Sequence, residues 1–120
     1  MRRLAVLISV LLCGCAEKEG LPRQIAGADP AKGLAAMEQT GCASCHAIPG
    51  IDWPRGAVGG SLAGFGARPL IAGRLPNRPD LLIQWVRDAP SLAPRTAMPA
   101  MPLTPAQAGD VAAYLYTLDD

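Results

Sequence analysis

Two cysteines and a histidine stand within five consecutive residues of the sequence, in the order Cys42-Ala43-Ser44-Cys45-His46. On one helical turn, residues three positions apart lie on the same face, so both thiols can bond to the two vinyl groups of one haem. The adjoining His46 can then place its imidazole beneath the iron. This spacing predicts one covalently attached haem c, bound through Cys42 and Cys45, with His46 as an iron ligand.

Three other uses of the motif remain as alternatives. A redox-active Cys-x-x-Cys pair typically follows a strand, whereas an alanine-rich helical pattern precedes Cys42. A zinc site needs four ligands, and the predicted domain offers two thiols and one imidazole. A disulfide across two residues closes a very short loop and adds little stability. The haem prediction is therefore favoured over all three.

The sixth iron ligand must come from another residue type, because His46 is the only histidine of the sequence. The thioether of methionine is the usual alternative. Met98 and Met101 each precede a proline, which favours an extended and stiff loop that can hold a weak iron–sulfur bond. Met37 shares a face of a predicted helix with Leu34, so we expect it to pack in the core. One of Met98 and Met101 is the predicted ligand.

Helices must position these residues. Asp29 and the proline after it form an N-cap and N1 pair for a helix over 30–40, which Gly41 ends. A short turn carries the haem motif. A further helix begins at Pro79, contains an apolar stripe at helical spacing and ends before Pro90.

The last helix has the clearest signal. Thr104-Pro105-Ala106-Gln107 is a capping box with proline at the first helical position. Apolar residues follow at helical spacing: Val111, Tyr114, Leu115 and Leu118. The other segments are long loops rich in glycine and proline, without convincing strand alternation. We therefore predict an all-α domain of about four short helices wrapped around the haem, which serves as the core that such loops lack.

Composition bounds the remaining possibilities. A chain of 120 residues with 50% apolar residues allows one small domain, and its net charge of +1 argues against nucleic-acid binding. The segment 53–103 contains six arginines and only two aspartates, which is a local excess of four positive charges. The arginines are Arg55, Arg68, Arg74, Arg78, Arg87 and Arg95, and the aspartates are Asp80 and Asp88. We expect some of them to neutralise the haem propionates and others to steer an acidic partner.

The N-terminal residues have the features of a targeting signal. Two arginines precede an apolar run over 4–12, which predicts a signal peptide over 1–14 that is too short to span a bilayer. The Leu-Cys-Gly-Cys sequence that ends at Cys15 resembles a bacterial lipobox, so we expect Cys15 to be acylated. Residues 15–28 are predicted as a flexible tether and residues 29–120 as the domain. The alternative is a soluble periplasmic protein that is cleaved near Ala16.

From Asp29 to Leu118 the chain resembles the class I mono-haem cytochromes c, and its N-terminus resembles that of the membrane-anchored lipoprotein members. The haem motif is the most specific feature. Gly33 on the first predicted helix and Tyr114-Leu115 on the last look like the close crossing of terminal helices in that family, where a glycine lets the backbones approach.

The resemblance implies roles for one further segment. Residues 59–65 and Arg68 are similar to the family segment Gly-Pro-x-Leu-x-Gly, which leads to an arginine near a propionate. Gly60 stands where the family usually has proline. The carbonyl at this position accepts the N–H of the proximal histidine, so Gly60 is expected to serve His46 through its backbone.

Two further roles follow from the same resemblance. The family ligand commonly lies in an Ala-Met-Pro sequence a few residues before the last helix, which favours Met98 over Met101. Trp85 looks like an aromatic residue against the haem on the methionine side, with a plain core role as the alternative.

The resemblance implies a monomeric one-electron carrier, not an enzyme, on the periplasmic side of a bacterial membrane. Its expected partners are a quinol-oxidising complex and a terminal oxidase. Two alternatives are a haem-bearing subunit of a periplasmic dehydrogenase complex and a gas-binding or catalytic haem protein with an open sixth site.

Overall fold

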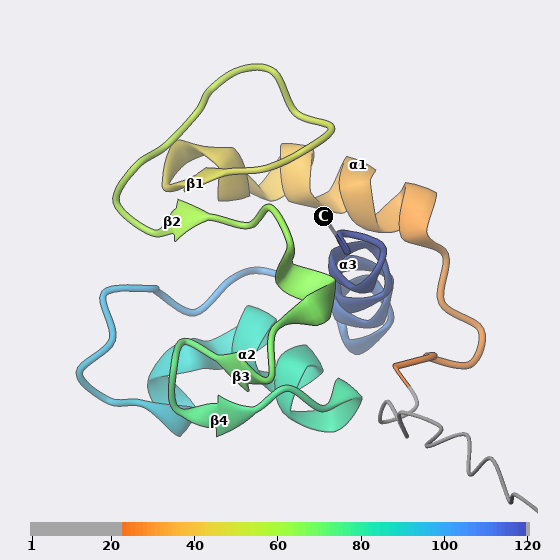
Figure 1. Ribbon diagram of the computed structural model, residues 1–120, viewed down its shortest axis with the longest axis vertical. Helices are drawn as coiled ribbons and strands as arrows, with labels where there is room; N and C mark the ends of the chain where they lie inside the picture. Colours follow the sequence, from red (N-terminus) through yellow and green to blue (C-terminus); the bar gives the residue numbers. More distant parts are fainter. Residues whose placement is uncertain (1–22, 120) are drawn as a thin grey trace, which may run out of the picture.

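The computed structural model describes residues 23–119 (Figure 1). The predicted signal peptide and Cys15 lie outside these residues. Within 23–119, no helix combines the length and the hydropathy that crossing a bilayer requires. The described chain contains three α-helices, which are α1 (Pro30–Thr40), α2 (Pro79–Leu92) and α3 (Pro105–Tyr116).

Local capping interactions set the bounds of α1. The Asp29 carboxylate accepts hydrogen bonds from the N–H groups of Ala31 and Lys32, which would otherwise lack partners. Gly41 ends the helix in the left-handed region, at φ 76°. The helix predicted over 30–40 is confirmed.

The predicted capping box also begins α3. Thr104 accepts a hydrogen bond from the Gln107 N–H at 3.2 Å, and the Gln107 amide oxygen accepts from the Thr104 N–H at 2.9 Å. Val111 and Leu115 are buried, as the apolar stripe predicts. The helix ends at Tyr116, so Leu118 lies beyond it.

The prediction that the helix after Pro79 ends before Pro90 is only partly right. The helical backbone is interrupted at Asp88 (φ −153°, ψ 71°), but helical residues resume and reach Leu92. The Asp88 carboxylate accepts from the Ser91 N–H at 3.3 Å, so it caps this second segment. Pro90 stands in the first turn of the segment, where its missing N–H would have no helical acceptor, and the proline is therefore tolerated.

Four two-residue strands lie in the loops of the described chain. β1 (His46–Ala47) pairs in parallel with β2 (Gly60–Ser61), and β3 (Leu70–Ile71) pairs antiparallel with β4 (Leu75–Pro76). Two 3₁₀ turns, η1 (Cys42–Ser44) and η2 (Phe65–Ala67), complete the elements. Strands this short give no alternation in the sequence, which is why none was predicted. The three α-helices still form the bulk of the regular structure.

Helix α3 contacts both α1 and α2 (Figure 1). At its crossing with α1, Gly33 lies directly against the backbone of Asp110 and Val111. The resemblance had pointed to Tyr114 and Leu115 as the residues opposite Gly33, so the crossing lies one turn earlier on α3 than expected. A hydrogen bond from the Asp29 N–H to the Asp110 carboxylate, 2.8 Å long, closes the same junction.

Residues 23–28 pack on the domain, although the sequence assigned them to the flexible tether. Ile25 packs against the hydrophobic core. The Arg23 guanidinium donates to the Arg68 carbonyl at 2.9 Å and lies over the Tyr116 ring at 5.7 Å. We call residues 23–28 the N-terminal arm. The folded domain therefore begins before Asp29.

Candidate haem-binding site

The residues of the haem motif follow α1 through a tight turn. Gly41 redirects the chain, and η1 brings the N–H of Cys45 to the carbonyl of Cys42 at 3.2 Å. Both thiols are free; that of Cys42 is half-buried and that of Cys45 is exposed. The Thr40 hydroxyl lies 3.4 Å from the Cys42 sulfur. The turn thus presents two unbonded thiols three residues apart.

His46 follows on β1 and has one ring nitrogen already in use. Its Nδ1 lies 2.9 Å from the Gly60 carbonyl oxygen on the paired strand β2. Because a carbonyl only accepts, Nδ1 is the donor in this hydrogen bond, and Nε2 is the ring nitrogen left for a metal. Behind the ring, a Cβ on Gly59 would lie 2.6 Å from Nε2 and 2.7 Å from Nδ1, so only glycine fits there.

The backbone of Gly60 explains its departure from the family pattern. Its φ is +76°, in the left-handed region, and no atom lies within 4 Å of the position that a Cβ would take. Proline has φ near −65° and cannot adopt this conformation. Glycine at this position therefore follows from the backbone of the loop and not from crowding.

An apolar cavity lies beside His46 and Cys42, between α1, α2 and α3. Apart from His46 and the Cys42 thiol, the side chains that line the cavity are apolar or aromatic and carry no charge. The twelve lining residues are Met37, Cys42, His46, Leu62, Phe65, Leu82, Trp85, Val86, Met98, Leu103, Val111 and Leu115. Trp85 reaches the cavity from α2 and is 9% exposed. Met98 reaches it from the loop between α2 and α3, far from His46 in the sequence.

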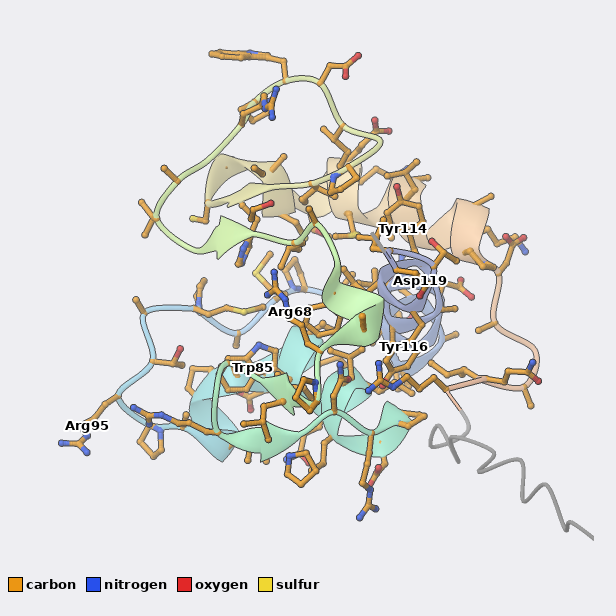
Figure 2. All side chains as sticks on the ribbon, viewed as in Figure 1. Arg68, Trp85, Arg95, Tyr114, Tyr116 and Asp119 are labelled. Atoms are coloured by element: carbon orange, nitrogen blue, oxygen red, sulfur yellow. The ribbon has the colours of Figure 1, made fainter. Side chains whose placement is uncertain are left out.

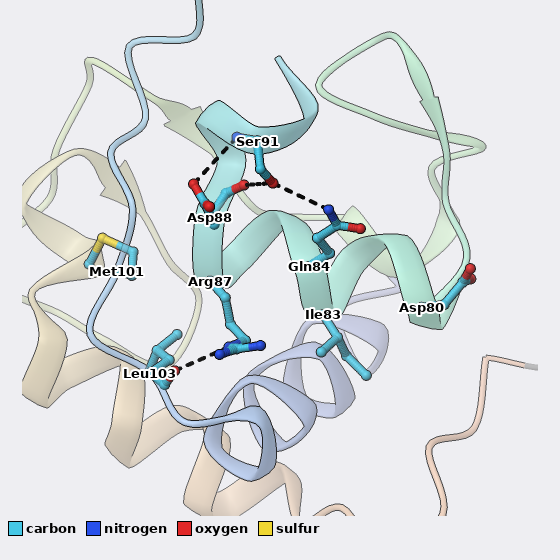
Figure 3. Close-up of a pocket in the computed structure, with 8 residues that line it drawn as sticks. All are labelled: Asp80, Ile83, Gln84, Arg87, Asp88, Ser91, Met101 and Leu103. Carbon is cyan, nitrogen blue, oxygen red and sulfur yellow. Dashed lines mark hydrogen bonds between the residues drawn. The ribbon is translucent and has the colours of Figure 1, made fainter. Parts of the chain in front are cut away.

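Met101 does not line this cavity. It lines a separate hollow of about 480 Å³ over the outer face of α2, together with Arg87, Asp88 and Leu103 (Figure 3). Polar and charged side chains share that hollow, so it lacks the apolar character of the cavity at His46. Of the two candidate methionines, only Met98 lines the cavity that His46 also lines. Met37 also lines the cavity, but it is 1% exposed and packs in the core, as expected.

Arg68 lies next to the cavity wall and does not line it. Its guanidinium donates to the carbonyls of Ser61, at 2.7 Å, and Ala63, at 3.1 Å, and it lies over the Phe65 ring at 5.6 Å. Figure 2 shows Arg68 and Trp85 directed toward the centre of the molecule. The guanidinium is therefore already bound to the segment after Gly60, which leaves its role toward a propionate as a prediction.

The sequence reasoning missed a buried polar cluster behind Arg68. Asn77 is 1% exposed, and its amide donates to the carbonyls of Arg68, at 2.9 Å, and Phe65, at 3.4 Å. The Tyr116 hydroxyl donates to the Asn77 side-chain oxygen at 3.1 Å, and burial raises the pKa of Tyr116 to about 12. A lone asparagine in a loop carries no sequence signal for such a role. The cluster connects α3 and the N-terminal arm to the segment that holds Arg68.

These residues fit a covalently bound haem. Two free thiols stand one turn apart, an imidazole has its Nε2 left for a metal, and a thioether lines the same cavity. Apart from the histidine and the thiol, the lining is apolar or aromatic, which suits a flat hydrophobic ring. Among residues 23–119, no three histidine, cysteine or acidic side chains gather as a metal cluster.

Comparison with known proteins agrees with this site. The family model described as Cytochrome c matches residues 30–119. Over 71 residues the chain is 38% identical to a protein of Alkalihalophilus pseudofirmus named Cytochrome c oxidase subunit 2. That match covers 59% of this chain and 20% of the relative, so the chain corresponds to about a fifth of the relative's length. Because the family match takes in the haem motif and all three helices, the chain belongs to the cytochrome c family and binds haem c covalently.

Proposed function

We propose that this protein is a class I, mono-haem cytochrome c that carries one electron at a time. Cys42 and Cys45 would hold the haem through thioether bonds, and His46 and Met98 would bind its iron. One observation carries the proposal, namely that His46 and Met98 line the same apolar cavity from elements that are distant in the sequence. The sequence contains one Cys-x-x-Cys-His motif, which supports a single haem.

The protein's own residues adapt the site to electron transfer. The haem supplies reversible one-electron chemistry at its iron when bound. The Gly60 carbonyl orients His46 through Nδ1 and makes its Nε2 a better donor. The Met98 thioether would supply the second protein ligand of the iron, and the apolar side chains around it would keep water away. Histidine and methionine ligation in a dry site raises the reduction potential and leaves no open position for oxygen or peroxide.

We further propose that an acylated Cys15 anchors the protein on the periplasmic side of a bacterial membrane. There it would act as a monomer between a quinol-oxidising complex and a terminal oxidase. The resemblance of 1–15 to a lipoprotein signal supports the anchor, and the similarity to part of an oxidase subunit supports a respiratory partner. Contact with such a partner should bury less than about 1,200 Å², as in weak redox encounters.

The visible spectrum of the oxidised protein tests the axial ligands. A methionine thioether bound to ferric haem gives a weak far-red sulfur-to-iron band, which we expect in the wild type and in Met101→Ala. Met98→Ala should lose the band and bind carbon monoxide rapidly when reduced. Loss of the band in Met101→Ala alone would show that the ligand has been wrongly assigned. Rapid carbon monoxide binding by the wild type would contradict the closed site and favour a gas-binding protein.

The anchor and the carrier role need separate experiments. Mass spectrometry of the mature protein should show acyl chains on Cys15, and Cys15→Ala should release the protein from the membrane fraction. Mild detergent extraction should yield the free monomer. Stable copurification with a dehydrogenase would instead indicate a dedicated haem subunit.

A further inference from the structure

The loop that carries Met98 makes few hydrogen bonds to the rest of the described chain. Pro99 and Pro102 have no N–H to donate. Within the loop, the Met98 N–H donates to the Thr96 hydroxyl at 3.2 Å, and the Leu103 N–H donates to the Met101 carbonyl at 2.8 Å. Neither bond joins the loop to another element, so they cannot fix its position over the cavity.

Both hydrogen bonds that join residues 97–103 to another element of the described chain go to Arg87 on α2. The Arg87 carbonyl accepts from the Met101 N–H at 2.8 Å. Its side-chain Nε donates to the Leu103 carbonyl at 3.2 Å. Figure 3 shows the Arg87 side chain extending from α2 to the loop at Leu103, with Met101 nearby. One residue thus holds the loop at two points after Met98.

Arg87 is well placed for this task. It follows Trp85 and Val86, which line the cavity, and it directly precedes the break at Asp88. Its backbone therefore continues directly from the residues of the cavity wall. Leu103, at the other end of the contact, is 6% exposed and also lines the cavity. Fixing Leu103 and Met101 to α2 limits how far Met98 can move from the cavity.

We propose that Arg87 is a positioning residue that keeps the Met98 thioether at the iron by fastening this loop to α2. The inference rests on the proposed axial role of Met98. An iron–thioether bond is weak, so the order of the loop decides how often the bond opens. Loss of a hydrogen bond from a charged donor should favour the open loop by roughly tenfold.

A matched pair of variants separates the hydrogen bond from the charge. In Arg87→Gln the amide nitrogen occupies the same place along the side chain as the arginine Nε and can still donate to Leu103. Arg87→Met has the same length as Arg87→Gln but places a methyl group where the donor stood. Both variants lack the charge, so any purely electrostatic effect is common to them. Arg95→Met is the control, since it removes an arginine of the same loop for which the described chain shows no side-chain hydrogen bond.

The measurement is imidazole binding to the oxidised, haem-loaded protein, followed by loss of the far-red band. Imidazole competes with Met98, so a looser loop binds it at lower concentration. We expect Arg87→Met to bind imidazole roughly tenfold more tightly, and Arg87→Gln and Arg95→Met to remain within about twofold of the wild type. Equal affinity in Arg87→Met and the wild type, or in Arg87→Met and Arg87→Gln, would overturn the proposal.

Two further observations keep the test decisive. If the wild type lacks the far-red band, or if Met98→Ala retains it, the proposed ligand is wrong and the failure does not concern Arg87. If Arg87→Met does not keep its fold, hydrogen exchange in the wild type replaces it. The Met101 amide should then exchange much more slowly than that of Ala100, which has no hydrogen-bond acceptor in the described chain. Equal exchange rates would overturn the proposal.

Discussion

The close crossing of α1 and α3 predicts that a single methyl group added at Gly33 greatly lowers the stability of the fold. Gly33 is buried where the two helices meet. A Cβ at this position would lie 2.5 Å from the Asp110 carbonyl carbon and 2.9 Å from the Val111 nitrogen, and still closer to the Asp110 oxygen. All three are backbone atoms of α3, so no side-chain rotation can relieve the overlap. Gly33→Ala must push the helices apart by roughly an ångström to restore ordinary contact distances.

The expected cost follows from three contributions. Overpacking a close-packed contact costs about 1–3 kcal/mol, and a backbone obstacle places this case at the upper end. Separation also strains the 2.8 Å hydrogen bond between the Asp29 N–H and the Asp110 carboxylate, worth about 1 kcal/mol. Alanine has a higher helix propensity than glycine, which offsets about 1 kcal/mol of this loss. The net loss should be about 3 kcal/mol, or roughly 10–20 °C in Tm for a domain of this size.

Guanidinium unfolding of the haem-loaded protein, followed by far-ultraviolet circular dichroism, measures this loss. Gly109→Ala is the matched control, because Gly109 is also a buried helical glycine, on α3. A Cβ there would meet only the Ile25 Cγ2, at an ordinary 3.8 Å. Gly109→Ala should therefore leave stability unchanged or raise it by up to about 1 kcal/mol. If Gly33→Ala stays within about 0.5 kcal/mol of the wild type, or if both variants lose the same amount, the reasoning from the crossing is refuted.

Three other substitutions test the loops around the site. Gly60→Pro introduces the residue that the family usually has, but at φ +76° it should cost about 2 kcal/mol or more in thermal unfolding, and an unchanged Tm would contradict this. Asn77→Leu removes the donors to the Phe65 and Arg68 carbonyls and should cost about 2–4 kcal/mol in urea unfolding, whereas a loss below about 1 kcal/mol would mean that water replaces them. Burial raises the pKa of Tyr116 from 10.0 to about 12, so between these pH values the folded protein keeps a proton that the unfolded chain releases. The contribution of this protonated hydroxyl to folding stability is therefore complete below pH 10 and is lost as the pH rises through 12. The unfolding midpoint of the wild type should therefore fall more steeply over this range than that of Tyr116→Phe, and parallel pH profiles would disprove the assignment.

Interactions between near neighbours were predictable from residue order. The thiols three residues apart and the histidine beside them belong to one turn. The Asp29 and Thr104 caps act on N–H groups two or three residues away, as the structure confirms. Such contacts are determined by backbone geometry over a few residues and hold in any surroundings. Haem attachment, α1 and the start of α3 could accordingly be predicted from the sequence.

Contacts between distant segments decided the rest. Both Met98 and Met101 precede a proline, and only the resemblance to a family favoured Met98. The path of the loop over α2 is what puts Met98 in the cavity and Met101 in a different hollow. The same holds for the N-terminal arm, where Arg23 looked like part of a polar tether until the Arg68 carbonyl and the Tyr116 ring were found beside it. Contacts between side chains that are dozens of residues apart depend on how the helices pack. A single sequence carries no local pattern for that packing.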